Sequence, residues 1–214
     1  MAGLQLQLDG ISWEHDGGRR SLKPGHLLAE GGTTSVVLAA DAADAEAFID
    51  VVLGQTWPDQ GTIRISGNEI TSLPTEERGI AFVPPGGGLL PHLTAEQNIA
   101  FGVERRYRAD HRRKHVHYVA GRLGLQGLLG WRPYELSPDE RLRVALARAM
   151  CRWHAAKAVL IEDRAGHTPC HAAVSECLKT YVDLPVLVVS DDRHRVETLR
   201  SPGGSWEVVD GDGS

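Results

Sequence analysis

Histidine and cysteine are the residue types that most often bind zinc, and the spacing of those in this chain indicates whether they could. His111, His115 and His117 follow one another at separations found among zinc ligands. The pattern includes no carboxylate or cysteine at ligand spacing. The three cysteines form no Cys-x-x-Cys pair and lie at Cys151, Cys170 and Cys177. We therefore predict no metal site and interpret the cysteines as core or half-buried thiols in a reducing compartment.

A strongly basic stretch surrounds these histidines. Between Glu104 and His117, six Arg and Lys residues accompany two acids. Three interpretations remain open: a solvated helix face, a surface that docks on a protein or on anionic lipid, and a contact with RNA or DNA. The whole chain carries a net charge of −5, so bulk attraction to nucleic acid is not expected. We predict no nucleic-acid partner.

The composition is that of a globular chain. Among 214 residues, 42% are hydrophobic, which is enough to bury a core. No stretch approaches the roughly 18 apolar residues needed to cross a bilayer, and the N-terminus lacks a basic segment followed by an apolar one. We expect a soluble, cytoplasmic protein that reaches a membrane only by docking on a partner.

The elements that must position any site begin with short strands and one clear helix. Leucines alternate with polar neighbours near the N-terminus, which predicts a hairpin-like β region over residues 4–13 that turns at Asp9-Gly10. An apolar run at 36–39 precedes helical spacing over 41–53, closed by Gly54. Further strands are predicted at 62–65 and 80–83.

The second half of the chain predicts a helical insert and then alternating strands and helices. Thr94 with Gln97 forms a capping box, and residues 104–129 show only helical spacing. Ser137-Pro138-Asp139-Glu140 is a strong helix start. Strands are predicted at 159–161, 185–189 and 206–209, with a helix at 171–181 between them. This alternation favours a largely parallel sheet.

Several segments, taken in order, resemble the ATPase domain of ATP-binding cassette (ABC) transporters, especially of the solute-importer type. They are the runs 54–63, 73–80, 90–102, 135–137 and 143–149. The resemblance implies a P-loop NTPase-like α/β fold with a mostly parallel sheet core, an N-terminal antiparallel β region and an inserted helical subdomain. It also implies one domain over residues 1–214, with the helical subdomain at about 87–150. In this family the helical subdomain meets the membrane subunit.

The phosphate loop of that family, GxxxxGK[ST], falls on residues 39–46, which read AADAADAE. In the family, glycine amides wrap the phosphates, a lysine neutralises them and a hydroxyl holds magnesium. Asp44 replaces the second glycine, Ala45 stands at the lysine position, Glu46 stands at the hydroxyl position, and Asp41 adds a third carboxylate. A carboxylate about 5 Å from a phosphate charge is repelled by roughly 3 kcal/mol at a dielectric near 20. We expect this loop to bind phosphate poorly.

The other chemical positions of the family are altered as well. The glutamine that contacts magnesium aligns with Pro85, and the signature LSGGQ reads LSPDE, which retains Ser137. The acidic pair at a strand end, a magnesium holder followed by a base, aligns in reverse order with Glu162 and Asp163. The switch histidine aligns with Asp191.

One position could keep its family role. His15 falls near the aromatic residue that stacks on adenine, with Trp13 two residues before it. Elsewhere, simple structural roles are available, because Asp41 or Asp44 can cap the helix that follows, and Ser137 can close a capping box with Glu140.

The family fold implies that the substituted carboxylates converge where phosphate and magnesium would bind. They are Asp41, Asp44, Glu46, Glu162, Asp163 and Asp191. Three outcomes are open: pairing with a cation such as Arg164 or self-capping, uptake of protons, or binding of a divalent ion.

The resemblance therefore implies a pseudo-ATPase: a non-hydrolysing structural or regulatory partner in a membrane transport complex. We expect no ATP or magnesium cofactor, with binding weak or lost, and no ATP-driven homodimer. The expected partners are a membrane subunit, an active ABC ATPase homologue, or both, at the inner face of the cell membrane. Two alternatives stay open, a stand-alone regulatory or scaffold protein and a weak ATPase that uses Glu162 and Asp163.

Overall fold

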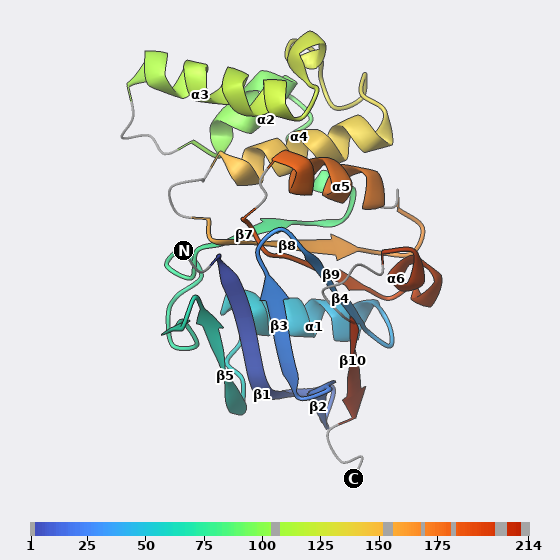
Figure 1. Cartoon of the computed structure of the whole chain (residues 1–214). Coiled ribbons are helices and arrows are strands. Elements are labelled where there is room, and N and C mark those ends of the chain that lie inside the picture. The colour runs from blue at the N-terminus through green and yellow to red at the C-terminus, as the bar shows by residue number, and fades with distance from the viewer. Residues whose placement is uncertain are drawn as a thin grey trace.

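The computed structural model describes residues 3–103, 108–151, 156–167, 170–180, 183–199 and 205–210. Within these residues ten strands form one sheet in the order β6-β5-β1-β2-β10-β4-β9-β8-β7, and β3 pairs with β1 (Figure 1). The sheet divides into an antiparallel half and a parallel half, and β10 joins them by pairing antiparallel with β2 and parallel with β4.

The antiparallel half is built around the first strand. Its strands are β1 (Gln5–His15), β2 (Gly18–Lys23), β3 (His26–Glu30), β5 (Gln60–Ile65) and β6 (Asn68–Glu69). The predicted turn at Asp9-Gly10 is wrong, because β1 continues through it with a shift in register against β5. The first part of β1 pairs with β3 and its second part with β2, so the change of partner takes the place of a turn. The hairpin turn lies instead at Asp16-Gly17, where both residues have positive φ.

The parallel half carries the strand ends that matter for function. Its strands are β4 (Thr34–Leu38), β7 (Ile80–Val83), β8 (Ala158–Asp163), β9 (Val186–Ser190) and β10 (Ser205–Asp210). They lie in the order β10-β4-β9-β8-β7, and each neighbouring pair is parallel. Strands β4, β8 and β9 are buried along their whole length, which explains their continuous apolar runs.

The helices begin and end largely where local sequence signals predict. They are α1 (Ala42–Leu53), α2 (Ala95–Phe101), α3 (Ala109–Arg122), α4 (Pro138–Met150), α5 (His171–Thr180) and α6 (Arg193–Leu199), with short 3-10 turns η1 (Pro85–Gly87) and η2 (Gln126–Leu128). Both predicted capping boxes are present, at Thr94 with Gln97 and at Ser137 with Glu140. Gly54 ends α1 in the left-handed conformation (φ 78°).

Two hydrophobic cores lie on opposite faces of the parallel strands. One core packs α1 between these strands and the antiparallel strands, and includes Phe48 and Val37. The other packs α2, α3, α4 and α5 on the opposite face, where the neighbouring Val36 points. Figure 1 shows this separation, with α1 below the parallel strands and α2 to α4 above them. None of the described helices is both long and apolar enough to span a bilayer.

A buried arginine fixes the carboxyl end of α1. The Arg78 guanidinium donates to the carbonyl oxygens of Val51 and Val52 at 2.8 and 2.9 Å. It also donates to the carbonyls of Leu73 and Thr71. Arg78 is 2% exposed, and burial lowers its pKa. These bonds satisfy carbonyls that the end of a helix leaves unpaired, and they place a cation at the negative end of the helix dipole.

Candidate functional site

The carboxyl ends of β4, β8 and β9 bring three segments of the sequence together. In register, Leu38 and Asp163 both lie beside Ser190. The Ala39 N–H donates to the Ser190 carbonyl at 2.8 Å. Segments 39–46, 162–167 and 190–192 therefore share one edge of the parallel sheet, where ligands bind in open α/β folds.

The first segment uses its own side chain to bind the helix start. Asp41 Oδ1 accepts from the amides of Ala43 and Asp44, both at 2.9 Å. Asp41 is thus the N-cap of α1, and the cap fills donors that would otherwise face a ligand. Ala45 is buried in the α1 core. At the position where the family loop has its lysine, this chain therefore has no side chain that reaches the sheet edge.

Asp44 does not cap the helix but binds an arginine from the antiparallel strands. Arg20 on β2 donates through Nε to Asp44 Oδ1 at 2.8 Å. The Asp44 residue is only 5% exposed. A charge-assisted hydrogen bond of this length compensates the cost of burying the carboxylate.

Arg164 joins the helix to the strand end. Its Nη2 lies 3.3 Å from Glu46 Oε2 on α1, and its Nε donates to Glu162 Oε1 at the end of β8. Glu46 is exposed, whereas Glu162 is buried. Burial raises the pKa of Glu162, Arg164 opposes the rise, and the nearby charges of Glu46 and Asp191 add to it. One guanidinium therefore serves two carboxylates that repel each other.

Arg195, on α6, holds the other strand-end carboxylate. Its Nη1 lies 3.1 Å from Asp163 Oδ1 and also donates to the Arg164 carbonyl at 2.7 Å. Burial raises the pKa of Asp163, and the charge of Arg195 opposes this rise. Asp191 is bound differently, because its Oδ1 accepts from the Ala165 amide at 2.8 Å. Glu46, Glu162 and Asp191 thus lie close enough to influence one another's charge. Each carboxylate of the predicted set is bound by a cation or an amide, although Asp163 Oδ2 is buried without a hydrogen-bond partner.

No metal-binding group forms from this convergence within the part of the chain that the structure describes. There, no set of three or more His, Cys, Asp or Glu side chains is arranged to hold an ion. The three histidines at 111, 115 and 117 lie on α3, where His117 Nε2 is 3.1 Å from Glu96 Oε1.

The position of Pro85 lies in a loop that a distant arginine fixes. Pro85 begins η1, and Gly86, Gly87 and Gly88 all have positive φ. Arg148 on α4 donates to the carbonyls of Gly87 and Gly88, both at 2.8 Å. Proline offers no N–H and no side-chain ligand here, and the loop is held through its carbonyls instead.

Ser137 serves its own helix. The Glu140 amide donates to Ser137 Oγ at 3.3 Å, and the Ser137 amide donates to Glu140 Oε2 at 2.7 Å. Asp139 is paired with Arg143 at 2.8 Å. The first turn of α4 is therefore satisfied internally, with its hydrogen-bonding groups bound within the helix.

The two candidate adenine-stacking residues, Trp13 and His15, both line one pocket of about 240 Å³. Trp13 is 1% exposed and packs on Phe48 with a centroid distance of 5.6 Å, so most of its ring belongs to the core. His15 is half-buried. Glu46 and Asp50 of α1 also line this pocket, and burial followed by the charge of Glu46 raises the pKa of Asp50.

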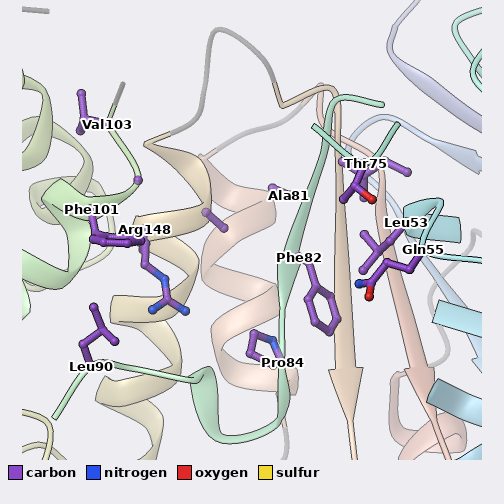
Figure 2. A pocket seen from close by; sticks show the side chains of 13 residues that line it. Leu53, Gln55, Thr75, Ala81, Phe82, Pro84, Leu90, Phe101, Val103 and Arg148 are labelled. Carbon is purple, nitrogen blue, oxygen red and sulfur yellow. The ribbon is translucent and has the colours of Figure 1, made fainter. Parts of the chain in front are cut away.

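A larger groove lies where the helical part meets the sheet, and the sequence analysis did not predict it. It has a volume of about 700 Å³. In Figure 2, Arg148 projects from α4 beside Phe101 and Leu90, and Phe82 and Leu53 lie on the sheet side. Phe101 is 68% exposed, although it is large and apolar. Only the alternation of apolar residues at the end of α2 could have indicated this groove, and that signal is too short to read.

The residues at the sheet edge do not fit a magnesium triphosphate in the way the family loop would hold it. Asp41 occupies the first amides of α1, Ala45 provides no charge, and Arg164 is bound to Glu46 and Glu162. We derive no catalytic step through a nucleotide from these contacts.

Comparison with known proteins places these features in context. A family model described as ABC transporter matches residues 47–163. The molybdate/tungstate import ATP-binding protein WtpC of Archaeoglobus fulgidus is 43% identical over 115 residues, covering 54% of this chain and 48% of the relative. The sn-glycerol-3-phosphate import ATP-binding protein UgpC of Escherichia coli K12 is 35% identical over 153 residues, covering 71% of this chain and 42% of the relative. The chain thus spans about half or less of these curated relatives.

Solved structures agree on the fold. The structure of cbiO1 from Clostridium perfringens, part of the transporter complex cbiONQ, has a TM-score of 0.75 at 19% identity and covers 91% of this chain and 81% of that chain. A nucleotide-free ATP-binding cassette from an ABC transporter has a TM-score of 0.71 at 16% identity, covering 91% of this chain and 84% of that chain. At these identities the likeness concerns the fold alone, and it confirms the predicted α/β fold with antiparallel and parallel strands.

The comparisons contradict one prediction. We expected no ATP or magnesium cofactor, but the relatives are named ATP-binding proteins, so that expectation is wrong. Altered phosphate contacts do not by themselves exclude the ligand. A nucleotide also binds through its base and sugar, and the loop at 39–46 corresponds only to the phosphate contacts.

Proposed function

Because the chain belongs to the ABC transporter family, we propose that it is the ATP-binding subunit of an import system and that it does not hydrolyse ATP. The names of both relatives state that they are ATP-binding proteins of import systems. They differ in the solute that they name, so no solute is carried over. Residues 1–214 would form one domain, with a helical subdomain at about 87–150.

The proposal that hydrolysis is lost rests on the contacts of the carboxylates at the strand ends. Hydrolysis requires a carboxylate or histidine that can orient or deprotonate water. Glu162 is bound to Arg164, Asp163 is bound to Arg195, and Asp191 accepts a backbone amide. The other oxygen of Asp163, Oδ2, has no hydrogen-bond partner, but it is buried and does not face solvent. None of the three carboxylates is therefore both unpaired and open to water.

The groove supports a membrane subunit as the partner. Its walls combine exposed apolar surface, chiefly Phe101, with the partly buried cation of Arg148. An exposed hydrophobic hollow of this kind is typical of a protein interface. Binding there would place the chain at the cytoplasmic face of the membrane.

An active homologue is the second proposed partner. The α4 start carries Asp139 and Glu140, and the α1 start carries Asp44 and Glu46. Arginines pair with Asp44, Glu46 and Asp139 within one copy and reduce this negative charge. Two copies that brought these ends together would still bring carboxylates close to one another, which disfavours an ATP-driven homodimer. A homologue with a neutral signature and a lysine in its phosphate loop would not face that repulsion.

Hydrolysis and binding are tested separately. We expect a fluorescent ATP analogue to bind, and ATP turnover to equal that of the E162Q/D163N variant, both alone and with an active homologue. Wild-type turnover above that of the variant would contradict the proposal and favour the weak ATPase.

Docking is tested by co-expression with candidate membrane subunits of import systems and co-purification in detergent. We expect F101E to abolish recovery of the membrane subunit. The control is Y134E, which introduces the same charge at an aromatic residue that is 71% exposed and does not line the groove. Equal recovery with both variants would place the interface elsewhere. Absence of any membrane partner for the wild type would favour a stand-alone scaffold.

A further inference from the structure

Helix α3 has an unusual distribution of charge. Residues 108–122 contain five Arg and Lys and a single acid, Asp110, although the whole chain carries a net charge of −5. Its buried residues are Val116, Val119 and Ala120, which belong to the core of the helical part. The basic residues therefore gather on one surface of an otherwise acidic protein.

The solvent-facing residues of this helix combine cations with an aromatic ring. We call the α3 face the set His111, Arg113, Lys114, Tyr118 and Arg122, all of which are exposed. The Arg113 side chain is 76% exposed and Tyr118 is 62% exposed. Lys114 and Tyr118 are four residues apart and so lie on the same side of the helix.

A second exposed aromatic residue adjoins the α3 face through α2. Glu96 on α2 lies 3.8 Å from Arg113 Nε and 3.1 Å from His117 Nε2. The amide of the preceding residue, Ala95, donates to the Trp131 carbonyl at 2.7 Å. Trp131 is 46% exposed. The cations and the indole thus belong to one continuous end of the molecule.

The shape of this surface indicates the kind of partner. Neither of the two pockets described above is lined by an α3 residue. Figure 1 shows α3 at the end of the molecule opposite the antiparallel strands β1, β2 and β5. An exposed helix at one end of the molecule is suited to contact with an extended surface.

We propose that the α3 face and Trp131 bind the anionic headgroups of a lipid bilayer directly. Arg and Lys are attracted to the negative surface of a membrane, and Trp and Tyr favour the boundary between headgroups and acyl chains. The inference rests on the proposed function only for the presence of a membrane beside the chain. It adds a contact that requires no membrane subunit.

The test is co-sedimentation of the purified chain with lipid vesicles. Vesicles of phosphatidylglycerol and phosphatidylcholine are compared with vesicles of phosphatidylcholine alone. We expect binding to the first only, reduced by high salt. R113E/K114E should lower the partition coefficient by about tenfold or more, because each cation near an anionic surface adds severalfold to binding.

The matched control is K23E/K157E, which makes the same change of net charge at two exposed lysines outside α3. We expect this control to bind as the wild type does. R113Q/K114Q is a second variant without new carboxylates, and thermal melting checks that each variant is folded. W131A should weaken binding at unchanged charge.

Several results would overturn the inference. They are equal binding by R113E/K114E and its control, equal binding to neutral and anionic vesicles, and binding only to polyglutamate or to a DNA duplex. Each of these outcomes leaves the proposed transport function intact, because the vesicles contain no membrane subunit. Conversely, ATP turnover would overturn the non-hydrolysing assignment without affecting lipid binding.

Discussion

At the scale of single residues, the site is defined by arginines that neutralise carboxylates. Arg164 binds Glu162 and Glu46, Arg195 binds Asp163, and Arg20 binds Asp44. A buried ion pair contributes little net stability, but removal of one partner leaves the other uncompensated. Substitution of one member of such a pair should therefore destabilise the protein more than substitution of both.

The Arg164 contact gives the first prediction. R164Q leaves the buried Glu162 carboxylate without its cation and should lower the free energy of unfolding by about 2 kcal/mol. The double variant E162Q/R164Q removes both charges and should recover most of that loss. Urea unfolding of the two variants and of E162Q measures the coupling. If the double variant is as unstable as R164Q, the pair is not coupled in this way.

The same carboxylates predict a dependence of stability on pH. Burial raises the folded-state pKa of Glu162 from its ordinary 4.5 and that of Asp163 from 3.8. The folded chain therefore binds more protons than the unfolded chain just above these values, and stability falls as the pH rises through that window. E162Q should flatten this part of the profile. Melting temperatures measured from pH 4 upward test this prediction. A melting temperature that rises with pH over this window would contradict it.

At the scale of elements, local signals located the helices better than the strands. Asp41, Thr94 and Ser137 cap α1, α2 and α4 as their spacing predicts. Strands β2 and β3 and helix α6 were not predicted, because they are short and depend on pairing or packing with distant segments. The predicted turn at Asp9-Gly10 is wrong for the same reason, because the strands that pair with β1 determine where β1 ends.

The capping box of α4 gives an element-scale prediction. S137A removes the side chain that accepts the Glu140 amide and should cost about 1 kcal/mol of stability. T94A on α2 is the comparison, because it removes an equivalent cap from a helix of the same helical part. Chemical unfolding monitored by circular dichroism measures both. No loss in S137A would mean that water replaces this cap.

The candidate site was predictable only in part. The carboxylates were found because they occupy positions of a known motif. One partner, Arg164, was predicted because it directly follows the acidic pair, and it binds Glu162 and Glu46. The other two partners were not predicted, because Arg20 lies 24 residues from Asp44 and Arg195 lies 32 residues from Asp163. Arg148 is 60 residues from Gly88. No local pattern encodes such pairs, and only the packing of elements that are distant in the sequence reveals them.

At the scale of the whole molecule, the parallel strands separate two cores, and all three cysteines lie in one of them. Cys151, Cys170 and Cys177 are buried on the face covered by α2 to α5. Burial raises the pKa of the Cys151 and Cys177 thiols to about 12, and it raises that of Cys170 as well. Neutral buried thiols react slowly, because the thiolate is the nucleophile.

Thiol labelling therefore reports opening of that core alone. We expect an aromatic disulfide reagent to label no cysteine rapidly at pH 8 in the native state, and to label three after denaturation. The rate should rise together with unfolding of the helical part in low denaturant. Rapid native labelling of one thiol would show that this core is open at that point.

The Arg78 contacts have a mechanical consequence for α1. The guanidinium fastens one end of a rod of 12 residues, which is about 18 Å long. A pivot of about 5° at that end would sweep the Asp41 end through roughly 1.5 Å, enough to break a hydrogen bond of ordinary length. The carboxyl end of α1 would stay in place, and the amino end would move farthest. The Arg20–Asp44 and Arg164–Glu46 contacts lie at that end of the helix, so we expect a displacement of either arginine to reorient the whole helix.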